Sequence, residues 1–328
     1  MTSQCDHELL PLVRRFGSHA PLTIAIVAAL IAGGLGSLCL PLARDAAETS
    51  RAAIQLWTTS CTLGYVLFIV LFEAKRGASD VDRLAKSLRP DARPLDPSLF
   101  ARNRHPRALL TMTVSGVLFG VVFNVLLDGV VYQVITGVAP TWAYAWGPPI
   151  LMMLWGLVFH AFWILIDNAR MLAHIAEHDL AVDLDDRSAL DVFADAGARH
   201  FLFLVGGLAV LPVQSILAGG LALRDIVPSV VIVLPVAILV FLWPVLAARS
   251  AIERAKRGEL ARIDPLLRAT EHLDDRYLLL SLHRHRIEQV PAWPVKLQNL
   301  ARLTLYLVIP PLAWIAAAIV DTLVSRYV

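Results

Sequence analysis

The sequence predicts an all-α, polytopic transmembrane helix bundle of about seven spans, and three observations lead to that fold class. Of 328 residues, 57% are hydrophobic and 17% are charged, against about 45–50% and about 25% in average globular chains. Apolar runs long enough to cross a bilayer recur along the chain, and basic residues gather in alternate connecting segments. The composition excludes an ordinary soluble enzyme, which must cover its surface with polar groups, and a disordered chain, which is poor in apolar residues.

Each crossing needs about 20 mostly apolar residues. Seven stretches qualify, none with Lys or Arg at its middle: 20–43, 52–72, 108–135, 143–166, 201–223, 227–248 and 301–324. They are too long for barrel strands, so we expect helices. Arg14 and Arg15 precede the first run as they would in a signal peptide, but the run is too long and lacks a clean cleavage site, so a retained helix is expected.

The distribution of Lys and Arg gives the orientation. Nine lie between the second and third runs and ten lie between Arg249 and Lys296, whereas the turn Thr136–Trp142 has none. We therefore expect the N-terminus inside, the C-terminus outside and a single integral membrane domain over residues 1–328, with cytoplasmic linkers at 73–107, 167–200 and 249–300. Trp243 and Trp293 fall where an inner aromatic belt is expected.

The linkers are predicted to be helical in part. The fourth span is expected to continue as a helix to about Asp179, and two helices are expected after the sixth span. Asp264 is a predicted N-cap with Pro265 at the first helical position, and Pro291 ends the second of these helices. Within the spans, Gly116 and Gly120 form a G-x-x-x-G pair for close helix packing, within the chain or between protomers.

Polar residues inside the spans are candidates for a solute pathway, because each is costly in hydrocarbon. Prolines within a span add candidates, since each frees the carbonyl four residues earlier to bind a cation or water. The pathway candidates are Asn124, Asp128, His160, Gln214, Pro212, Pro310 and Pro311. The alternative for each polar residue is a hydrogen bond that only holds the bundle together, and for each proline a simple kink.

One short motif points to a metal. His174, Glu177 and His178 match the H-x-x-E-H order of inverted zinc peptidases, with the two histidines on one helix face and the glutamate as base. A third ligand is required, and Glu253 is the acidic residue to test. The alternative is a helix end enriched in polar groups. No other cofactor is predicted.

These features favour a small-solute or ion transporter or channel, in which Asp128 attracts the cation. The alternative is a non-transporting sensor, scaffold or assembly partner that docks a cytoplasmic protein through Asp264–Val290 and its Leu278–Leu282 face. A membrane-embedded metal enzyme is a third hypothesis. Expected partners are the bilayer, a small ion or solute, a second copy and a cytoplasmic protein. The net charge of +2 gives no reason to expect nucleic acid.

Two stretches, Ala181–Phe201 and Arg284–Asp321, resemble segments of uncharacterised bacterial polytopic inner-membrane proteins. The residues that carry the resemblance include Asp183-Leu184-Asp185 in the first stretch and Pro291-Ala292-Trp293-Pro294 in the second. The resemblance implies a bacterial inner (cytoplasmic) membrane location, and it implies no activity, cofactor or catalytic residue.

Overall fold

The computed structural model describes residues 19–85, 87–92, 106–123, 142–186, 188–217, 223–269, 275–294 and residue 305. Apart from an isolated bridge between Leu88 and Leu180, the regular structure in these residues is helical, which confirms the all-α prediction. The α-helices of the described part are α2 (Ala20–Ser37), α3 (Ala46–Ala85), α5 (Pro106–Phe123), α7 (Gly147–His174), α8 (Ser188–Leu217), α9 (Leu223–Ala269) and α10 (Asp275–Gln289).

Four stretches of the described residues are long and apolar enough to cross a membrane, where the sequence predicts seven. They are Ala20–Leu42, Ala46–Ala85, Trp142–Asp179 and Val233–Ala269, and Pro106–Val122 is a shorter apolar helix. Most of the seventh expected span and residues 124–135 of the third lie outside the described residues, as does the end of the fifth. The chain therefore has the helices of a multi-pass membrane protein, with four candidate spans.

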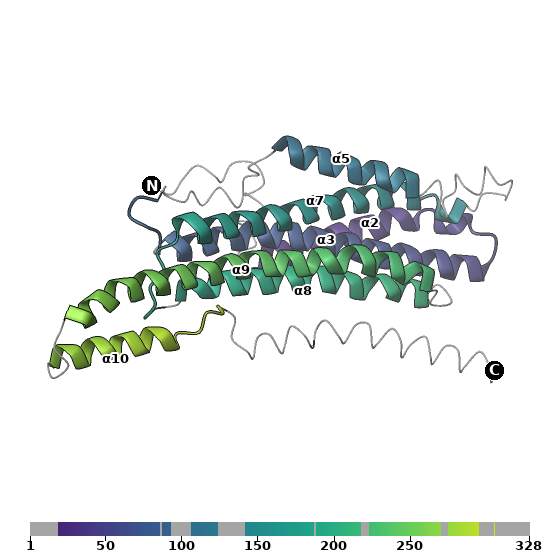
Figure 1. Cartoon of the computed structure of the whole chain (residues 1–328). Coiled ribbons are helices and arrows are strands. Elements are labelled where there is room, and N and C mark those ends of the chain that lie inside the picture. The colour runs from purple at the N-terminus through teal and green to yellow at the C-terminus, as the bar shows by residue number, and fades with distance from the viewer. Residues whose placement is uncertain are drawn as a thin grey trace, which may run out of the picture.

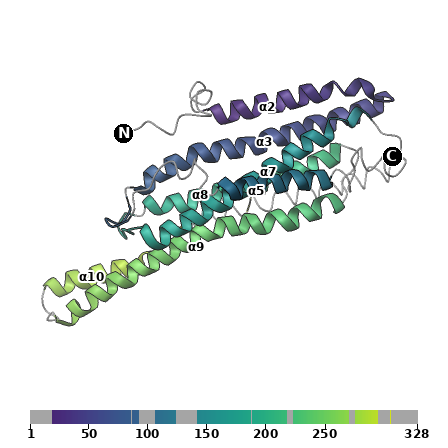
Figure 2. The same ribbon diagram turned by 90° about the horizontal axis from the view of Figure 1, so that it is seen from above.

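The helices form an elongated bundle (Figure 1). Helix α3 contacts α2, α7 and α8, α9 packs on α7 and α8, and α5 packs on α7. At one end of the bundle α9 continues past the other helices and turns back as α10, so that the two form a projecting hairpin (Figure 2). Helix α9 has 47 residues, which at 1.5 Å per residue makes it about 70 Å long.

Small residues set the closest helix contacts, and they act within the chain. A Cβ atom on Gly116 of α5 would collide with the carbonyl oxygen of Trp155 on α7, and one on Gly120 would lie 3.0 Å from the Cα of Met152. On α3, a Cβ on Gly64 would lie 2.8 Å from the carbonyl oxygen of Ala25 on α2. The G-x-x-x-G pair therefore serves intrachain packing.

Large apolar side chains lie both inside the bundle and on its outer surface. The interior holds fully buried residues such as Leu56 towards one end and Ile252 towards the other. On the outside, α2 exposes Leu30 and Leu35 to 56% and 64%, and α5 exposes Leu118 to 59%. An apolar exterior over several helices is what lipid contact requires, and it would be unstable in water.

Two predicted boundaries are corrected. Helix α3 does not end with the apolar run at residue 72 but continues to Ala85. Helix α9 passes without a break through Asp264 and Pro265, where a new helix was expected. A proline costs the helix one backbone hydrogen bond, and here Ile263 is buried while Asp264 pairs with Arg284 of α10, so packing between the two helices outweighs the local stop signal.

Two other boundaries are confirmed. Helix α7 continues beyond its apolar run to His174 and is followed by a π-helical turn, Ile175–Asp179, which ends at the predicted residue. Helix α10 ends at Gln289, two residues before Pro291.

Candidate functional site

Buried polar side chains gather on one helix of the bundle. Among the described residues, eight polar or charged side chains are buried, and six of them belong to α3. These six are Glu48, Thr59, Ser60, Thr62, Glu73 and Asp80, and the other two are Asn168 on α7 and His200 on α8. Within the described residues, helix α3 therefore contributes most of the buried polar side chains, although its middle is apolar enough to cross a membrane.

Most of the buried polar residues of α3 share one face. Glu48 and Thr62 are 14 residues apart, Thr62 and Glu73 are 11 apart, and Glu73 and Asp80 are 7 apart. Each interval is close to a whole number of turns at 3.6 residues per turn. Between Thr62 and Glu73 the face is closed by the buried side chains of Val66 and Ile69. The polar face thus has an N-terminal part and a C-terminal part, about 16 Å apart along the helix.

The C-terminal part is built around Glu73, whose side chain is fully buried. Its Oε1 accepts a hydrogen bond from Nε of Arg199 at 2.7 Å, and its Oε2 accepts one from Nε2 of His200 at 2.9 Å. The amide of Asn168 also donates to Oε2, at 3.4 Å. Three helices, α3, α7 and α8, therefore meet on one carboxylate.

Arg199 joins this carboxylate to a second one. Its Nη2 donates to Oδ2 of Asp80 at 2.8 Å, so one guanidinium bridges Glu73 and Asp80. Nε of Arg76 lies 3.8 Å from Oδ1 of Asp80, and the side chain of Arg76 is 45% exposed. The cluster Glu73–Arg199–Asp80 therefore extends from the bundle interior to a solvent-exposed cation near the C-terminal end of α3.

Three buried atoms next to or along this face lack a hydrogen-bond partner among the described residues: Oδ1 of Asp80, Nδ1 of His200 and Oγ of Ser60. Buried polar atoms are almost always hydrogen-bonded, so such atoms call for a functional explanation. Two of the three belong to groups that exchange protons. The geometry suits proton or cation transfer, because Glu73 and His200 share one hydrogen bond and Arg199 has two alternative carboxylates.

The residues of this cluster were not singled out from the sequence. Glu73 directly follows the expected second span, and Asp80 lies seven residues later in a segment with Lys75 and Arg76, which reads as a solvated linker. The sequence signal that could have identified the cluster is that Glu73 and Asp80 fall on the same helix face. Their partners on α8 are more than 100 residues away in the chain, and no spacing rule connects them.

The predicted pathway residues are placed only in part. Nδ1 of His160 on α7 lies 3.0 Å from Oγ1 of Thr113 on α5, which is an interhelical hydrogen bond and favours the bundle-holding interpretation of that histidine. Pro212 and Gln214 lie in the last turns of α8. Asn124, Asp128, Pro310 and Pro311 lie outside the described residues. The pathway through these residues stays a prediction.

The predicted metal motif lies at the end of α7. The rings of His174 and His178 pack on each other with centroids 4.4 Å apart, and Nδ1 of His178 lies 3.1 Å from the carbonyl oxygen of His174. Glu253 pairs instead with Arg249 at 2.8 Å. In the described part of the chain, no three His, Cys, Asp or Glu side chains gather as a metal site requires. These contacts favour a polar helix end.

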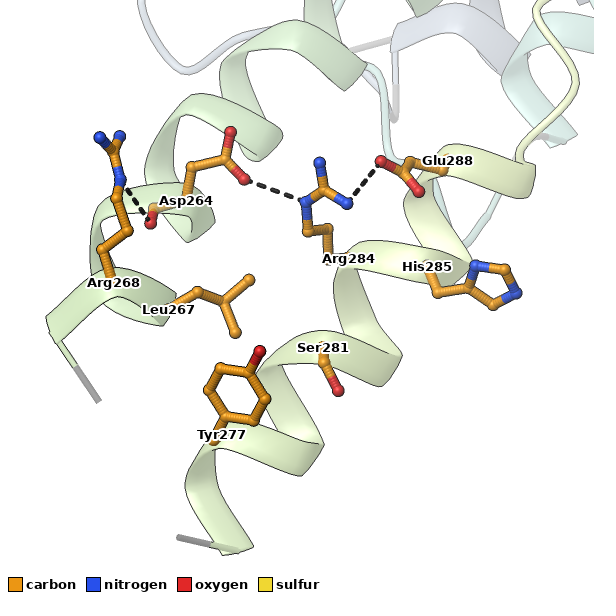
Figure 3. Close-up of a pocket in the computed structure, with 8 residues that line it drawn as sticks. All are labelled: Asp264, Leu267, Arg268, Tyr277, Ser281, Arg284, His285 and Glu288. Carbon is orange, nitrogen blue, oxygen red and sulfur yellow. Dashed lines mark hydrogen bonds and ion pairs between the residues drawn. The ribbon is translucent and has the colours of Figure 1, made fainter. Parts of the chain in front are cut away.

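A second polar region lies in the hairpin (Figure 3). Nε of Arg284 donates to Asp264 at 3.0 Å, and its Nη1 pairs with Glu288 at 2.8 Å. The hydrogen bond to Asp264 and the charge of Glu288 raise the pKa of the Arg284 guanidinium above its ordinary value. A groove of about 570 Å³ runs beside this arginine, with Tyr277 and Leu267 facing each other across it.

The far part of α10 is apolar and uncovered. Leu278, Leu279 and Leu282 are 59%, 68% and 57% exposed. Nearer the bundle, Arg286 pairs with Asp185 of the segment before α8 at 2.9 Å, and Lys256 donates to the carbonyl oxygens of Glu288 and Val290. The base of the hairpin is therefore fastened to the bundle, while its tip presents leucines to the surroundings.

No family model, no curated protein and no solved structure matches this chain. Its function is therefore inferred from the residues of the site alone, since a fold by itself does not determine a function.

Proposed function

We propose that the chain is a seven-span protein of the bacterial inner membrane, with its N-terminus inside and its C-terminus outside, that transports protons or a small cation. The spans are those expected from the sequence, and the positive segments lie in the cytoplasm. The observation that carries the proposal is the fully buried carboxylate of Glu73, which accepts hydrogen bonds from Arg199, His200 and Asn168. Glu73 directly follows the expected second span, so it stands at the cytoplasmic end of the bundle, and its side chain is buried in the bundle interior, where ionisable groups of membrane proteins mark ion and proton routes.

In this proposal the route follows the polar face of α3. Glu48 stands near its outer end, Glu73 and Asp80 stand at its inner end, and Val66 and Ile69 separate the two parts. That supports stepwise transfer with a closed intermediate, as in a transporter, rather than a water-filled channel.

At the inner end of α3, we assign a change of ion-pair partners that depends on whether Glu73 is protonated. With Glu73 ionised, Arg199 bridges it to Asp80, and His200 donates to it. Protonation of Glu73 removes its attraction for the guanidinium, which then remains paired with Asp80 alone. Nδ1 of His200 has no partner within the described residues and can accept a proton, and as it does so Nε2 gives its own proton to Glu73, so that the ring remains neutral. In this proposal Asp128 attracts the cation at the outer side of the membrane.

The test is ion flux into proteoliposomes that contain the purified protein and a pH-sensitive dye. Proton and Na⁺ or K⁺ gradients are applied in turn, and Glu73→Gln is compared with Glu177→Gln. Glu177 is exposed, so its substitution changes the same charge without entering the interior. The proposal predicts flux that Glu73→Gln loses and Glu177→Gln keeps. Equal flux in both variants would remove Glu73 from the mechanism.

The second candidate is the non-transporting scaffold that docks a cytoplasmic protein, and the exposed leucines of α10 favour it. From residue 248, where the sixth span is expected to end, α9 continues for 21 residues to Ala269, or about 32 Å. The tip leucines therefore lie too far from the membrane for lipid to cover them. If a partner protein co-purifies with the wild type and Leu278→Gln abolishes that co-purification while ion flux is unchanged, the result would support this function over transport.

A further inference from the structure

A small two-stranded clasp forms at the inner end of the bundle. The amide of Arg89 donates to the carbonyl oxygen of Asp179 at 2.9 Å, and the amide of Ala181 donates to Ser87, also at 2.9 Å. Leu88 and Leu180 form the bridge between these segments. Between this clasp and α9 lies a hollow of about 240 Å³. Its walls are mostly short or apolar side chains, which leaves room for a ligand.

Two arginines, Arg89 and Arg254, are among the residues that line this hollow. Nη2 of Arg254 donates to the carbonyl oxygens of Ala176 and Glu177, at 3.2 and 2.9 Å, so the end of α7 holds this arginine in place. Arg89 is exposed, and within the described residues its guanidinium makes no hydrogen bond or ion pair. Arg89 therefore has N–H donors available for a ligand, and it lies beside Arg254, whose guanidinium is already held in place.

The charged residues that line the hollow are both arginines. Glu253, next to Arg254 in sequence, is paired with Arg249 at 2.8 Å. An anion is thus favoured. The planar fork of arginine matches phosphate oxygens with two parallel hydrogen bonds, which makes a phosphate group the best-fitting anion.

The hollow lies at the depth of lipid headgroups. Its residues on α9, Ala251 to Ala255, come three to seven residues after the expected end of the sixth span, or about 5–10 Å beyond the hydrocarbon. One tryptophan marks the same level: the guanidinium of Arg249, two residues before Ala251, lies 4.9 Å from the ring centre of Trp293. Tryptophan prefers the membrane interface.

We propose that the Arg89–Arg254 hollow binds a phosphate group at the cytoplasmic face of the membrane, supplied by the headgroup of an anionic lipid. The inference rests on the membrane placement given above and is independent of transport. Basic pockets at the cytoplasmic ends of membrane helices are suited to such headgroups. The same chemistry would accept a soluble phosphate compound, and the test separates the two sources.

The experiment is a titration of the purified full-length protein in neutral detergent, followed by native mass spectrometry. Phosphatidylglycerol, phosphatidylcholine and inorganic phosphate are added separately to the wild type, Arg89→Gln and Arg257→Gln. Arg257 is the matched control because it is exposed on the same helix and, in the described part of the chain, its side chain donates to no group but the carbonyl oxygen of Glu253 on its own helix, at 3.3 Å. Arg254 is left intact because its loss would also free the carbonyls at the end of α7.

The proposal predicts that phosphatidylglycerol binds more tightly than phosphatidylcholine and that Arg89→Gln weakens it about fivefold, while Arg257→Gln leaves it unchanged. Binding of inorganic phosphate with the same dependence on Arg89 would support the phosphate site and assign it to a soluble compound. Equal losses in Arg89→Gln and Arg257→Gln would mean diffuse surface charge and would overturn the proposal. So would equal affinity for the two lipids together with no binding of inorganic phosphate.

Discussion

Two arginines of this protein each bridge a pair of carboxylates, and they differ chiefly in burial. Arg199 joins Glu73 and Asp80 at 2.7 and 2.8 Å, with its side chain 15% exposed and the carboxylates at most 2% exposed. Arg284 joins Asp264 and Glu288 at 3.0 and 2.8 Å, with all three side chains at least 40% exposed. The same substitution at both positions therefore isolates the effect of burial.

Removal of one partner from a buried ion pair leaves an uncompensated charge and costs about 3–5 kcal/mol. An exposed pair contributes about 0–1 kcal/mol. We expect Arg199→Gln to lower the free energy of unfolding by about 3–5 kcal/mol, because Glu73 keeps only His200 and Asn168 as donors. Arg284→Gln should change it by less than about 1 kcal/mol.

The assay is reversible unfolding in mixed micelles, with the transition midpoint and slope measured for each variant. The double variant Glu73→Gln/Arg199→Gln should recover part of the loss, because it removes the buried carboxylate that Arg199→Gln leaves unpaired. Asp80 retains Arg76 at 3.8 Å in both cases. A loss for Arg199→Gln no larger than that for Arg284→Gln, or no recovery in the double variant, would refute the buried-cluster account.

Three further predictions concern other parts of the chain. Gly116→Ala should destabilise the protein by about 1–3 kcal/mol in the same assay. In the control Gly34→Ala, the added Cβ has no atom within 4 Å, so this change should be neutral or stabilising by up to about 1 kcal/mol. Equal effects of the two substitutions would contradict the α5–α7 packing. Asp128→Asn should abolish cation flux while expression and unfolding stay unchanged, and unaltered flux would exclude this residue from the pathway. Zinc content measured by elemental analysis should be sub-stoichiometric and the same in wild type and His178→Gln, and a full equivalent lost in the variant would revive the metal hypothesis.

Local sequence signals predicted the parts of the fold that depend on local physics. The first apolar run gives a candidate span, Ala20–Leu42, almost at the predicted bounds, since it is a long run of apolar residues without interruption. The end of α10 before Pro291 follows from the missing amide of proline and the restriction on the residue before it. Helix continuation after the fourth span was also visible in the sequence.

The errors arose where contacts between distant segments outweigh local preference. Asp264 and Pro265 have the form of a helix start, yet the pairing of Asp264 with Arg284 and the burial of Ile263 keep α9 continuous. The candidate site was missed for a similar reason. Glu73 has the local sequence of a solvated linker, and only its partners on α8, 126 and 127 residues away, identify it as buried.

The most direct test of the central claim is the initial rate of proton entry into proteoliposomes under an imposed pH gradient, compared between Glu73→Gln and Glu177→Gln. Before reconstitution, both variants are required to unfold with a single transition in mixed micelles. The account predicts that Glu73→Gln falls to the rate of protein-free liposomes while Glu177→Gln matches the wild type. A wild-type rate in Glu73→Gln would contradict the claim that the buried carboxylate of α3 carries the proton.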